Sequence, residues 1–343
     1  MGGDHGPPVI VPAIARGEAI WRERNVRFLL HGAQALIEAE MVRHPAARAF
    51  CEIRHTDQVI SGDEKPAQAM RRGKGSSLWN AIEALREGQA HAAVSSGNTG
   101  AMMAISKLIL RMVSPALERP AIVVSWPTAR GYTTVLDVGA NIECDAERLA
   151  DFAIMGEAFH RAIHKAARPS VGLMNVGTED LKGRDEVREA HRLLSNGALG
   201  LDYRGFVEGD DIAKGTVDVI VTDGFTGNVL LKTGEGVARF IAAELRAALT
   251  GSLLGMIGAF IAQGALKSLR RRIDPPAGGP LLGLNGIVVK SHGGADAKGF
   301  CDAIGMAVDL VQSQLAADIR RNLEQLTVTL QAEAAGAAPA DPR

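Results

Sequence analysis

Glycine, asparagine, serine, threonine and aspartate gather in five short segments of this 343-residue chain, and these residue types suit the binding of an anion. Glycine lets backbone N–H groups approach a phosphate closely, and amide and hydroxyl side chains donate hydrogen bonds without adding charge. One such segment is typical of an ordinary turn between a strand and a helix, whereas five of them favour a binding site. The segments are SSGNTGA (95–101), LDVGAN (136–141), NVGTEDLKG (175–183), TDGFTGN (222–228) and KSHGGAD (290–296).

Three side chains in these segments could assist a reaction through charge or proton transfer. Lys182 suits a phosphate or the oxyanion of an acyl-transfer intermediate, although a solvated lysine beside Glu179 and Asp180 is the plain alternative. His292 follows a predicted strand, where it could act as a general acid or base near neutral pH or serve only the structure. Asp223 ends another predicted strand, where it could handle a proton, orient a donor or simply cap a helix.

Further polar side chains in the same segments are predicted to contact phosphate or the carbonyl oxygen of a substrate. Asp137 is one of them, although helix capping alone would also explain its position. The other candidates are Ser96, Asn98, Thr99, Asn141 and Asn228.

The motifs that the chain lacks narrow the chemistry. It contains no GxGxxG, GxxxxGK[ST], HExxH or GxSxG pattern, so the signatures of dinucleotide binding, P-loop phosphate transfer, zinc hydrolysis and α/β-hydrolases are missing. Cys51, Cys144 and Cys301 are odd in number and widely spaced, which argues against a disulfide framework or a zinc ribbon. We therefore expect no metal, no cofactor and no cysteine nucleophile.

The five segments must be held by strands and helices, and the sequence predicts an alternation of the two. Nearly continuous apolar runs separated by helical patterns indicate a mostly parallel sheet that is covered on both faces. Because the carboxyl ends of parallel strands share one edge, we expect all five segments to meet in a common crevice there. The predicted strands are 26–30, 92–95, 121–125, 133–137, 170–175, 217–222 and 286–290, and the clearest helices are 78–87, 100–112 and 143–165.

The segment 252–272 departs from this pattern, because it is apolar at first and then abruptly basic. Leu253, Ile257 and Phe260 share one face of a predicted helix, and Lys267 with the arginines at 270–272 lies at its end. Its apolar part is shorter than the roughly 20 residues that span a bilayer, so contact with an anionic membrane surface is one interpretation. Burial against a second subunit is the other, and the two are compatible.

Composition places the chain among globular proteins. With 46% hydrophobic and 22% charged residues and a formal net charge of −1, it lacks the basic footprint of a nucleic-acid binder. No secretory signal is visible at the start, so the cytoplasm is the expected compartment. We expect a single α/β/α domain over residues 1–330, with a helical insertion at about 250–273, and a disordered Ala/Pro-rich tail over residues 331–343.

Taken in order, the motifs resemble those of the bacterial phosphate acyltransferases of phospholipid synthesis over about residues 1–325. Besides the five segments, the resemblance includes MGGD (1–4), FVEGDDI (206–212), the longer DGFTGNVLLK (223–232) and GGPLLGLNG (278–286). It implies a three-layer α/β/α sandwich like those of isocitrate and isopropylmalate dehydrogenases. It also implies transfer of a long-chain acyl group from acyl-carrier protein to inorganic phosphate, without a cofactor.

The same resemblance implies a homodimer, attached peripherally to the inner face of the cell membrane, that passes acyl phosphate to a membrane acyltransferase. This chain departs from the family in two places. Family members usually begin with a strand and Asp-Ala ahead of MGGD, whereas this chain starts at the Met of that motif, so either the start codon is assigned late or an inner strand is absent. Gly294 and Ala295 stand where serines are common, which removes hydroxyl contacts from that loop and keeps His292.

Two other functions remain open at this stage. A phosphotransacetylase-like enzyme that uses acyl-coenzyme A would need the same kind of site. A non-catalytic membrane scaffold would not, so the packed Gly/Asn segments count against it.

Overall fold

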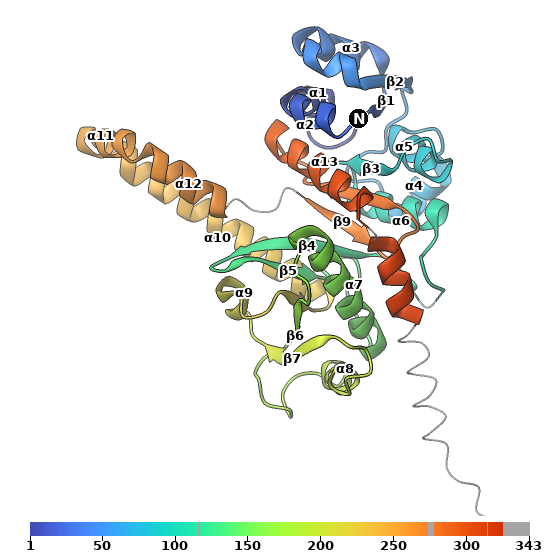
Figure 1. The fold of residues 1–343 in the computed structure, drawn as a ribbon. Coiled ribbons are helices and arrows are strands. Elements are labelled where there is room, and N and C mark those ends of the chain that lie inside the picture. Colours follow the sequence, from blue (N-terminus) through green and yellow to red (C-terminus); the bar gives the residue numbers. More distant parts are fainter. Residues whose placement is uncertain (116, 274–277, 314, 325–343) are drawn as a thin grey trace, which may run out of the picture.

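The computed structural model describes residues 1–115, 117–273, 278–313 and 315–324, apart from the side chains of 270–273, and its fold is α/β (Figure 1). An eight-stranded sheet has the strand order β3-β10-β9-β4-β5-β8-β6-β7, and a two-stranded sheet joins β1 to β2. The predicted α/β class with a mostly parallel sheet is confirmed. The strands are β1 (Phe28–Gly32), β2 (Cys51–His55), β3 (Ala92–Ser95), β4 (Ala121–Thr128), β5 (Gly131–Leu136), β6 (Ser170–Met174), β7 (Asp202–Val207), β8 (Val219–Val221), β9 (Gly278–Leu282) and β10 (Ile287–Ser291).

Helices cover both faces of the large sheet. Adjacent residues of a strand point to opposite faces, and Val123 packs with the cluster under α7 and α13 while Val124 packs toward α10. The helices are α1 (Pro7–Arg16), α2 (Glu18–Glu23), α3 (Gln34–Arg43), the 3-10 helix η1 (Pro45–Phe50), α4 (Pro66–Arg72), α5 (Ser77–Arg86), α6 (Thr99–Leu110), α7 (Ala146–His164), α8 (Asp185–Ser195), α9 (Asp211–Lys214), α10 (Gly224–Thr250), α11 (Leu253–Ile261), α12 (Gln263–Ile273) and α13 (Ala297–Val311).

The strand directions divide the five polar segments into two groups. β3 and β10 are parallel to each other, whereas β9 is antiparallel to both β10 and β4, and β4 is antiparallel to β5. β5, β8, β6 and β7 then share one direction, opposite to that of β3 and β10. The expectation of one common edge is therefore wrong: the segments after β3 and β10 leave one edge, and those after β5, β6 and β8 leave the other.

Helix α7 shows why the core forms where it does. The side chain of Asp145 accepts a hydrogen bond from the backbone N–H of Arg148 and begins the helix, and Lys165 ends it in a left-handed conformation. Phe152 and Phe159 on its buried side have no exposed surface and pack with the strands of the large sheet. Burying two such rings stabilises the fold by roughly 2–3 kcal/mol each, so this layer fixes the sheet that carries the site.

Between the two sheets lies a cavity of about 560 Å³ whose walls include residues of β1, β3, α1 and α13. Met1 lines it, and within the described residues β3 has β10 as its one strand neighbour while β1 has β2. The two interpretations of the start of the chain, a late start codon or an absent inner strand, both stay predictions.

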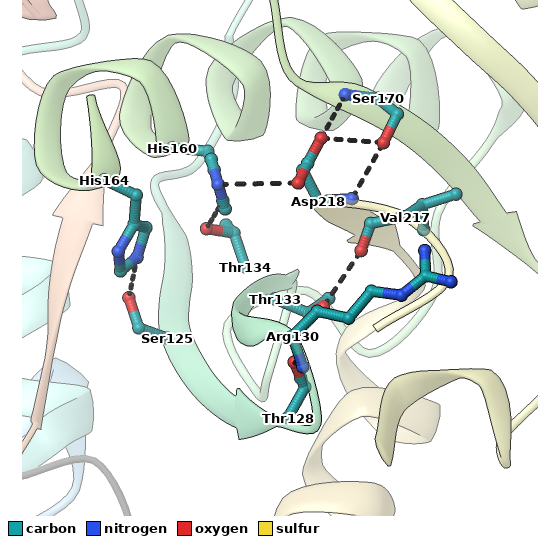
Figure 2. Close-up of polar contacts among 10 residues, drawn as sticks. All are labelled: Ser125, Thr128, Arg130, Thr133, Thr134, His160, His164, Ser170, Val217 and Asp218. Carbon is teal, nitrogen blue, oxygen red and sulfur yellow. Dashed lines mark hydrogen bonds and ion pairs between the residues drawn. The ribbon is translucent and has the colours of Figure 1, made fainter. Parts of the chain in front are cut away.

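A buried polar network near the amino ends of β5 and β6 joins the C-terminal part of α7 to the sheet (Figure 2). The hydroxyl of Thr134 lies 2.9 Å from Nδ1 of His160, and that of Ser125 lies 2.9 Å from Nε2 of His164. The two imidazole rings are 4.6 Å apart, and Nε2 of His160 lies 3.9 Å from a carboxylate oxygen of Asp218. Burial, with a smaller effect from His160, lowers the pKa of His164 from 6.5 to about 4.

This network predicts a loss of stability in mild acid. The unfolded chain protonates His164 below about pH 6.5, whereas the folded chain keeps it neutral down to about pH 4, so the free energy of unfolding falls as pH falls between these values. We expect a loss of about 1 kcal/mol between pH 7 and pH 5, after allowing for residual water contact. Urea unfolding of the parent and His164→Gln at both pH values measures it. An equal acid loss in the variant would contradict the assignment to His164.

The segment 252–272 forms two helices, so the expectation of one helix is wrong. Helix α11 ends at Ile261, and the next residue, Ala262, donates its backbone N–H to the carbonyl oxygen of Gly258 and accepts from the backbone N–H of Leu266 in α12. Helix α11 is bent 115° from α10. Together α10, α11 and α12 project from the body as an arm (Figure 1). The side chains at 270–272 and the tail 331–343 lie outside the described residues. No described helix could cross a bilayer alone, whereas α10 and α11 together have the length and composition for a bent span.

Candidate active site

Helix α10 connects the two groups of polar segments. Its first turn packs against the loop after β5, where the backbone N–H of Gly224 donates to the carbonyl oxygen of Asn141 at 2.7 Å. A Cβ atom on Gly227 would overlap the backbone oxygen of Asp137, so only glycine allows this approach. Seven residues after Asn228, Glu235 of the same helix reaches His292 in the loop after β10. The helix thus runs from one group to the other, over about 10 Å at the rise of an α-helix.

The loop after β5 is organised by a buried carboxylate. Asp137 has no exposed surface and accepts hydrogen bonds from the backbone N–H groups of Ile122, Ala140 and Asn141 and from the Asn141 side-chain amide. The Asn141 amide also donates to the carbonyl oxygen of Pro120. Burial raises the pKa of Asp137, and these donors oppose that rise. Both side chains are engaged within the protein, so they shape the loop, and direct substrate contact by either stays a prediction.

Asp223 and Asn228 lie next to this loop, at what we call the Asp137 end of the site. Asp223 is 3% exposed, caps α10 by accepting from the backbone N–H of Thr226, and forms an ion pair with Arg184. Asn228 is exposed, and its side chain lies where a Cβ atom on Gly139 would make van der Waals contact. Asn228 therefore presents an amide at the mouth of the loop, while Arg184 brings a cation from the segment after β6.

Lys182 lies two residues before Arg184 in that segment. Its side chain is 50% exposed, and its Nζ atom is 2.8 Å from a carboxylate oxygen of Glu179. The carboxylate of Glu179 raises the pKa of Lys182, so the lysine is charged at neutral pH. The side-chain amide of Asn175 donates to the carbonyl oxygen of Lys182 at 3.0 Å, which fixes the backbone of the loop and leaves the long side chain to move.

The other end of the site, here called the His292 end, contains a buried carboxylate among cations. Glu235 is 8% exposed and lies 3.9 Å from Nε2 of His292, 3.6 Å from Nζ of Lys232 and 3.9 Å from a guanidinium nitrogen of Arg239. Residues three or four apart share a helix face, so Asn228, Lys232, Glu235 and Arg239 form one stripe along α10. That stripe connects the two ends.

Lys290 belongs to the same end. It is partly buried, and its Nζ atom donates to the carbonyl oxygens of Ser96, at 3.4 Å, and Ser291. Burial lowers the pKa of Lys290 to about 8, with Asp4 acting to raise it and Lys232 acting to lower it. The backbone N–H of Asp4 donates to the carbonyl oxygen of Gly293 at 3.0 Å, so the N-terminal segment is fastened to the His292 loop.

The structure also places Ser96 at the His292 end, where its hydroxyl lies 3.3 Å from the carbonyl oxygen of Gly2. Asn98 is a different case. Its side chain accepts from the backbone N–H of Ala101 as the cap of α6 and donates to carbonyl oxygens in the turn at 61–64, so its hydrogen-bonding groups are already used. Thr99, the first residue of α6, is exposed. Phosphate contact by Asn98 and Thr99 stays a prediction.

Most of the sequence candidates thus lie at the two ends of the site, and several residues that line these ends were not among them. Arg184, Lys232, Glu235 and Lys290 were missed. A signal was present for two of them, because Lys232 and Glu235 follow Asn228 at helical spacing. Lys290 was harder to find, because a lysine in an apolar strand looks like an ordinary surface residue until the sheet buries it.

The cysteines offer no reactive thiolate. Burial raises the pKa of the Cys51 and Cys144 thiols to about 12, and burial also raises the pKa of Cys301. A neutral buried thiol is a poor nucleophile. This chemistry agrees with a reaction in which the attacking group belongs to a substrate.

Residues 1–318 match the family described as fatty acid synthesis protein. The chain is 63% identical to the phosphate acyltransferase of Caulobacter vibrioides, covering 98% of this chain and 93% of that protein. It is 59% identical to the phosphate acyltransferase of Phenylobacterium zucineum, covering 99% and 96%. In fold it is similar to a phosphotransacetylase from Streptococcus pyogenes, with a TM-score of 0.59, 17% identity and coverage of 88% of this chain and 91% of that one.

Proposed function

The chain belongs to the fatty acid synthesis protein family and, within it, to the phosphate acyltransferases, and from that premise we propose that its acyl donor is long-chain acyl-carrier protein. The chain is an enzyme that transfers an acyl group to phosphate. The proposed product is a long-chain acyl phosphate for phospholipid synthesis. The proposed setting is the cytoplasmic face of the membrane, where a membrane acyltransferase consumes that product.

The course of α10 between the two ends supports acyl transfer between two bound substrates, and the choice of carrier protein as donor follows from the resemblance of the motifs to the phosphate acyltransferases of phospholipid synthesis. A thioester donor and a phosphate acceptor are two separate substrates, and the enzyme must hold them in contact. Asn228 at one end and Lys232 one turn further along can face both, because residues four apart lie on one side of a helix. Holding two reactants in a productive orientation supplies up to roughly 7–11 kcal/mol of the barrier reduction.

The reaction needs no covalent enzyme intermediate. An oxygen of hydrogen phosphate forms a bond to the thioester carbonyl carbon, and the carbon–sulfur bond then breaks. The proton lost by phosphate ends on the thiolate of the carrier protein, with His292 as the proposed carrier of that proton. Asn228 and Lys182 are proposed to stabilise the oxyanion of the tetrahedral intermediate, at about 3–4 kcal/mol for each well-placed donor. Asp223, paired with Arg184 and capping α10, is proposed to keep the start of α10 in place.

Direct detection of acyl phosphate tests the proposal. Purified enzyme is given phosphate with either palmitoyl-carrier protein or palmitoyl-coenzyme A, without metal or nucleotide, and the product is trapped with hydroxylamine. We expect product from the carrier protein in the presence of EDTA. Product from coenzyme A alone would favour the phosphotransacetylase-like alternative, and no product from either donor would favour a scaffold. A requirement for NAD or ATP would refute the mechanism.

The arm of α10, α11 and α12 is the proposed contact with the membrane. No residue of α11 is buried, and Leu253, Ile257 and Phe260 are 71%, 49% and 73% exposed. Apolar side chains gathered at a protruding tip are typical of a surface that something else covers. A lipid surface and a second subunit are the two proposed occupants, and an arm of this length can serve both at different positions.

Liposome co-sedimentation distinguishes the two occupants of the tip. We expect the parent protein to bind anionic vesicles reversibly and less strongly at high salt, because each basic residue near the surface adds about 1 kcal/mol. Leu253→Glu with Phe260→Glu should abolish that binding and leave the dimer intact by light scattering. Ile20→Glu, at an exposed apolar position on α2, is the matched control. A double variant that is monomeric, in a protein that never bound vesicles, would refute membrane contact through α11.

A further inference from the structure

The His292 end of the site carries more positive than negative charge. Lys232, Arg239 and Lys290 are cations, and the carboxylates near them belong to Glu235 and Asp4. Glu235 is shared by Lys232, Arg239 and His292, so it cannot pair fully with any one of them. An anion bound here would restore the balance of charge.

We propose that Lys290 and Lys232, with His292, form the binding site for inorganic phosphate, the acceptor in the reaction. The proposal rests on the proposed function, since it assigns that function's second substrate to one end of the site. It differs from the sequence-based expectation, which placed the main positive charge for phosphate at Lys182. The contacts of Lys290 and the backbone around it carry the argument.

Lys290 is held in place in a way that suits a ligand-binding cation. Its Nζ atom donates to two carbonyl oxygens, those of Ser96 and Ser291, and among the described residues the carboxylate that acts on its charge is that of Asp4. Bringing an ammonium group out of water beside a second one is costly unless an anion compensates. Burial lowers the pKa of Lys290, the carboxylate of Asp4 acts to raise it, and the charge of Lys232 acts to lower it.

The backbone around Lys290 is rich in glycine. Three glycine-containing stretches meet here, and a Cβ atom on Gly2 would lie 3.2 Å from Cα of Gly97. The Gly293–Gly294 turn faces the carboxylate of Asp4, 3.2 Å from where a Cβ on Gly294 would be. Glycine in such turns lets N–H groups come close to phosphate oxygens without a side chain in the way.

Lys232 lies between this phosphate site and the proposed position of the acyl group. It lies four residues after Asn228, which is about 6 Å along the axis of α10, and on the same face. A phosphate that bridges Lys232 and Lys290 can therefore present an oxygen to a carbonyl held at Asn228. His292 adjoins the same phosphate and can take the proton lost when the new oxygen–carbon bond forms. Glu235, 3.9 Å from His292, would then stabilise the imidazolium.

Phosphate binding is tested directly, without any acyl donor. Broadening of the phosphorus NMR signal of inorganic phosphate is measured with the parent, Lys290→Met, and the control Lys298→Met, whose lysine pairs with Asp302 on the exposed side of α13. We expect Lys290→Met to weaken phosphate binding about tenfold or more, and Lys298→Met to bind like the parent. Equal binding by a folded Lys290→Met would overturn the proposal.

Kinetics provide a second measurement if Lys290→Met does not fold. In the parent, the KM for phosphate should rise between pH 7 and pH 9, because Lys290 loses its proton near pH 8, and Lys290→Arg should remove most of that rise. Asp4, Lys232, Glu235, Arg239 and His292 are the other charged and titratable groups at this end, and Lys290→Arg leaves all of them unchanged, so the difference between parent and variant reports on Lys290. A KM for phosphate that is flat in the parent would overturn the proposal. Phosphate binding without acyl phosphate formation would instead refute the donor assignment and would still support the phosphate-binding site.

Discussion

Replacing Lys182 by alanine is expected to lower turnover at least about tenfold while leaving the melting temperature unchanged. The reason for the first effect is the proposed role of Lys182, since a cation that reaches the developing oxyanion can contribute up to about 3–4 kcal/mol to the stability of the transition state. The reason for the second is that the side chain is half exposed and pairs with Glu179 at the surface, where such ion pairs contribute little to folding. Steady-state kinetics with acyl-carrier protein and phosphate measure the change.

A matched control separates a catalytic role from the general loss of a surface charge. Lys214 forms the same kind of exposed pair, with Nζ 2.6 Å from a carboxylate oxygen of Asp210, and it is the last residue of α9. Lys214→Ala should keep parental turnover. If Lys182→Ala retained more than half of the parental turnover, Lys182 would be a solvated lysine and nothing more.

Serine variants of the cysteines complete the comparison. Cys51→Ser, Cys144→Ser and Cys301→Ser should each retain turnover, because the buried thiols are neutral at the pH of the assay. A folded but inactive variant, most informatively Cys144→Ser, would indicate a covalent acyl-enzyme and would change the mechanism.

The elements that position the site could be predicted where apolar periodicity is strong. β3 has the predicted bounds, 92–95, and α7 falls inside the predicted helix 143–165. β2, β7 and β9 were missed because charged residues or glycines interrupt their patterns, as in GGPLL of β9. A pattern of apolar residues reports that a strand is buried, and it says little about a short or polar one.

Strand direction was the larger error, because it decides which polar segments meet. β4 and β5 are joined by two residues, Ala129 and Arg130, which is too short for the crossover that parallel neighbours need. The short connection in the sequence thus indicates a hairpin between two predicted strands. Because of this hairpin, β4 runs antiparallel to β5 and to the strands beyond β5. β9 reverses the strand direction again: β10 follows β9 after four residues and pairs with it antiparallel, but β9 itself was not among the predicted strands, so this second hairpin was missed.

The candidate side chains show a second limit of sequence reasoning. Asn98 and Asn228 sit in similar Gly/Thr-rich segments, yet the first caps α6 and fastens the turn at 61–64 while the second is exposed beside Gly139. An asparagine that satisfies backbone groups and one that awaits a ligand look alike until their partners are known. The same holds for Lys182 and Lys290, of which only the structure shows the second to be desolvated.

Substitution of Gly227 by alanine is expected to disrupt the connection between α10 and the loop after β5. The added Cβ would overlap the backbone carbonyl oxygen of Asp137. The side-chain carboxylate of the same residue is held in place by four hydrogen-bond donors. Neither partner can move without breaking the loop that carries Asn141. We expect the free energy of unfolding to fall by about 3 kcal/mol. We also expect turnover to fall by more than about tenfold, because displacement by 1 Å can cost that much in an oriented reaction.

Gly236 provides the control on the same helix. A Cβ there would meet nothing within 4 Å, so Gly236→Ala should keep turnover and gain about 0.5–1 kcal/mol from the better helix propensity of alanine. Urea unfolding and the acyl phosphate assay on both variants give the comparison. Since both substitutions add the same methyl group to α10, a difference between them measures the contact with Asp137 alone. If Gly227→Ala were as stable and as active as Gly236→Ala, the close approach of α10 to the loop after β5 would not be what holds Asn228 and Lys232 in position.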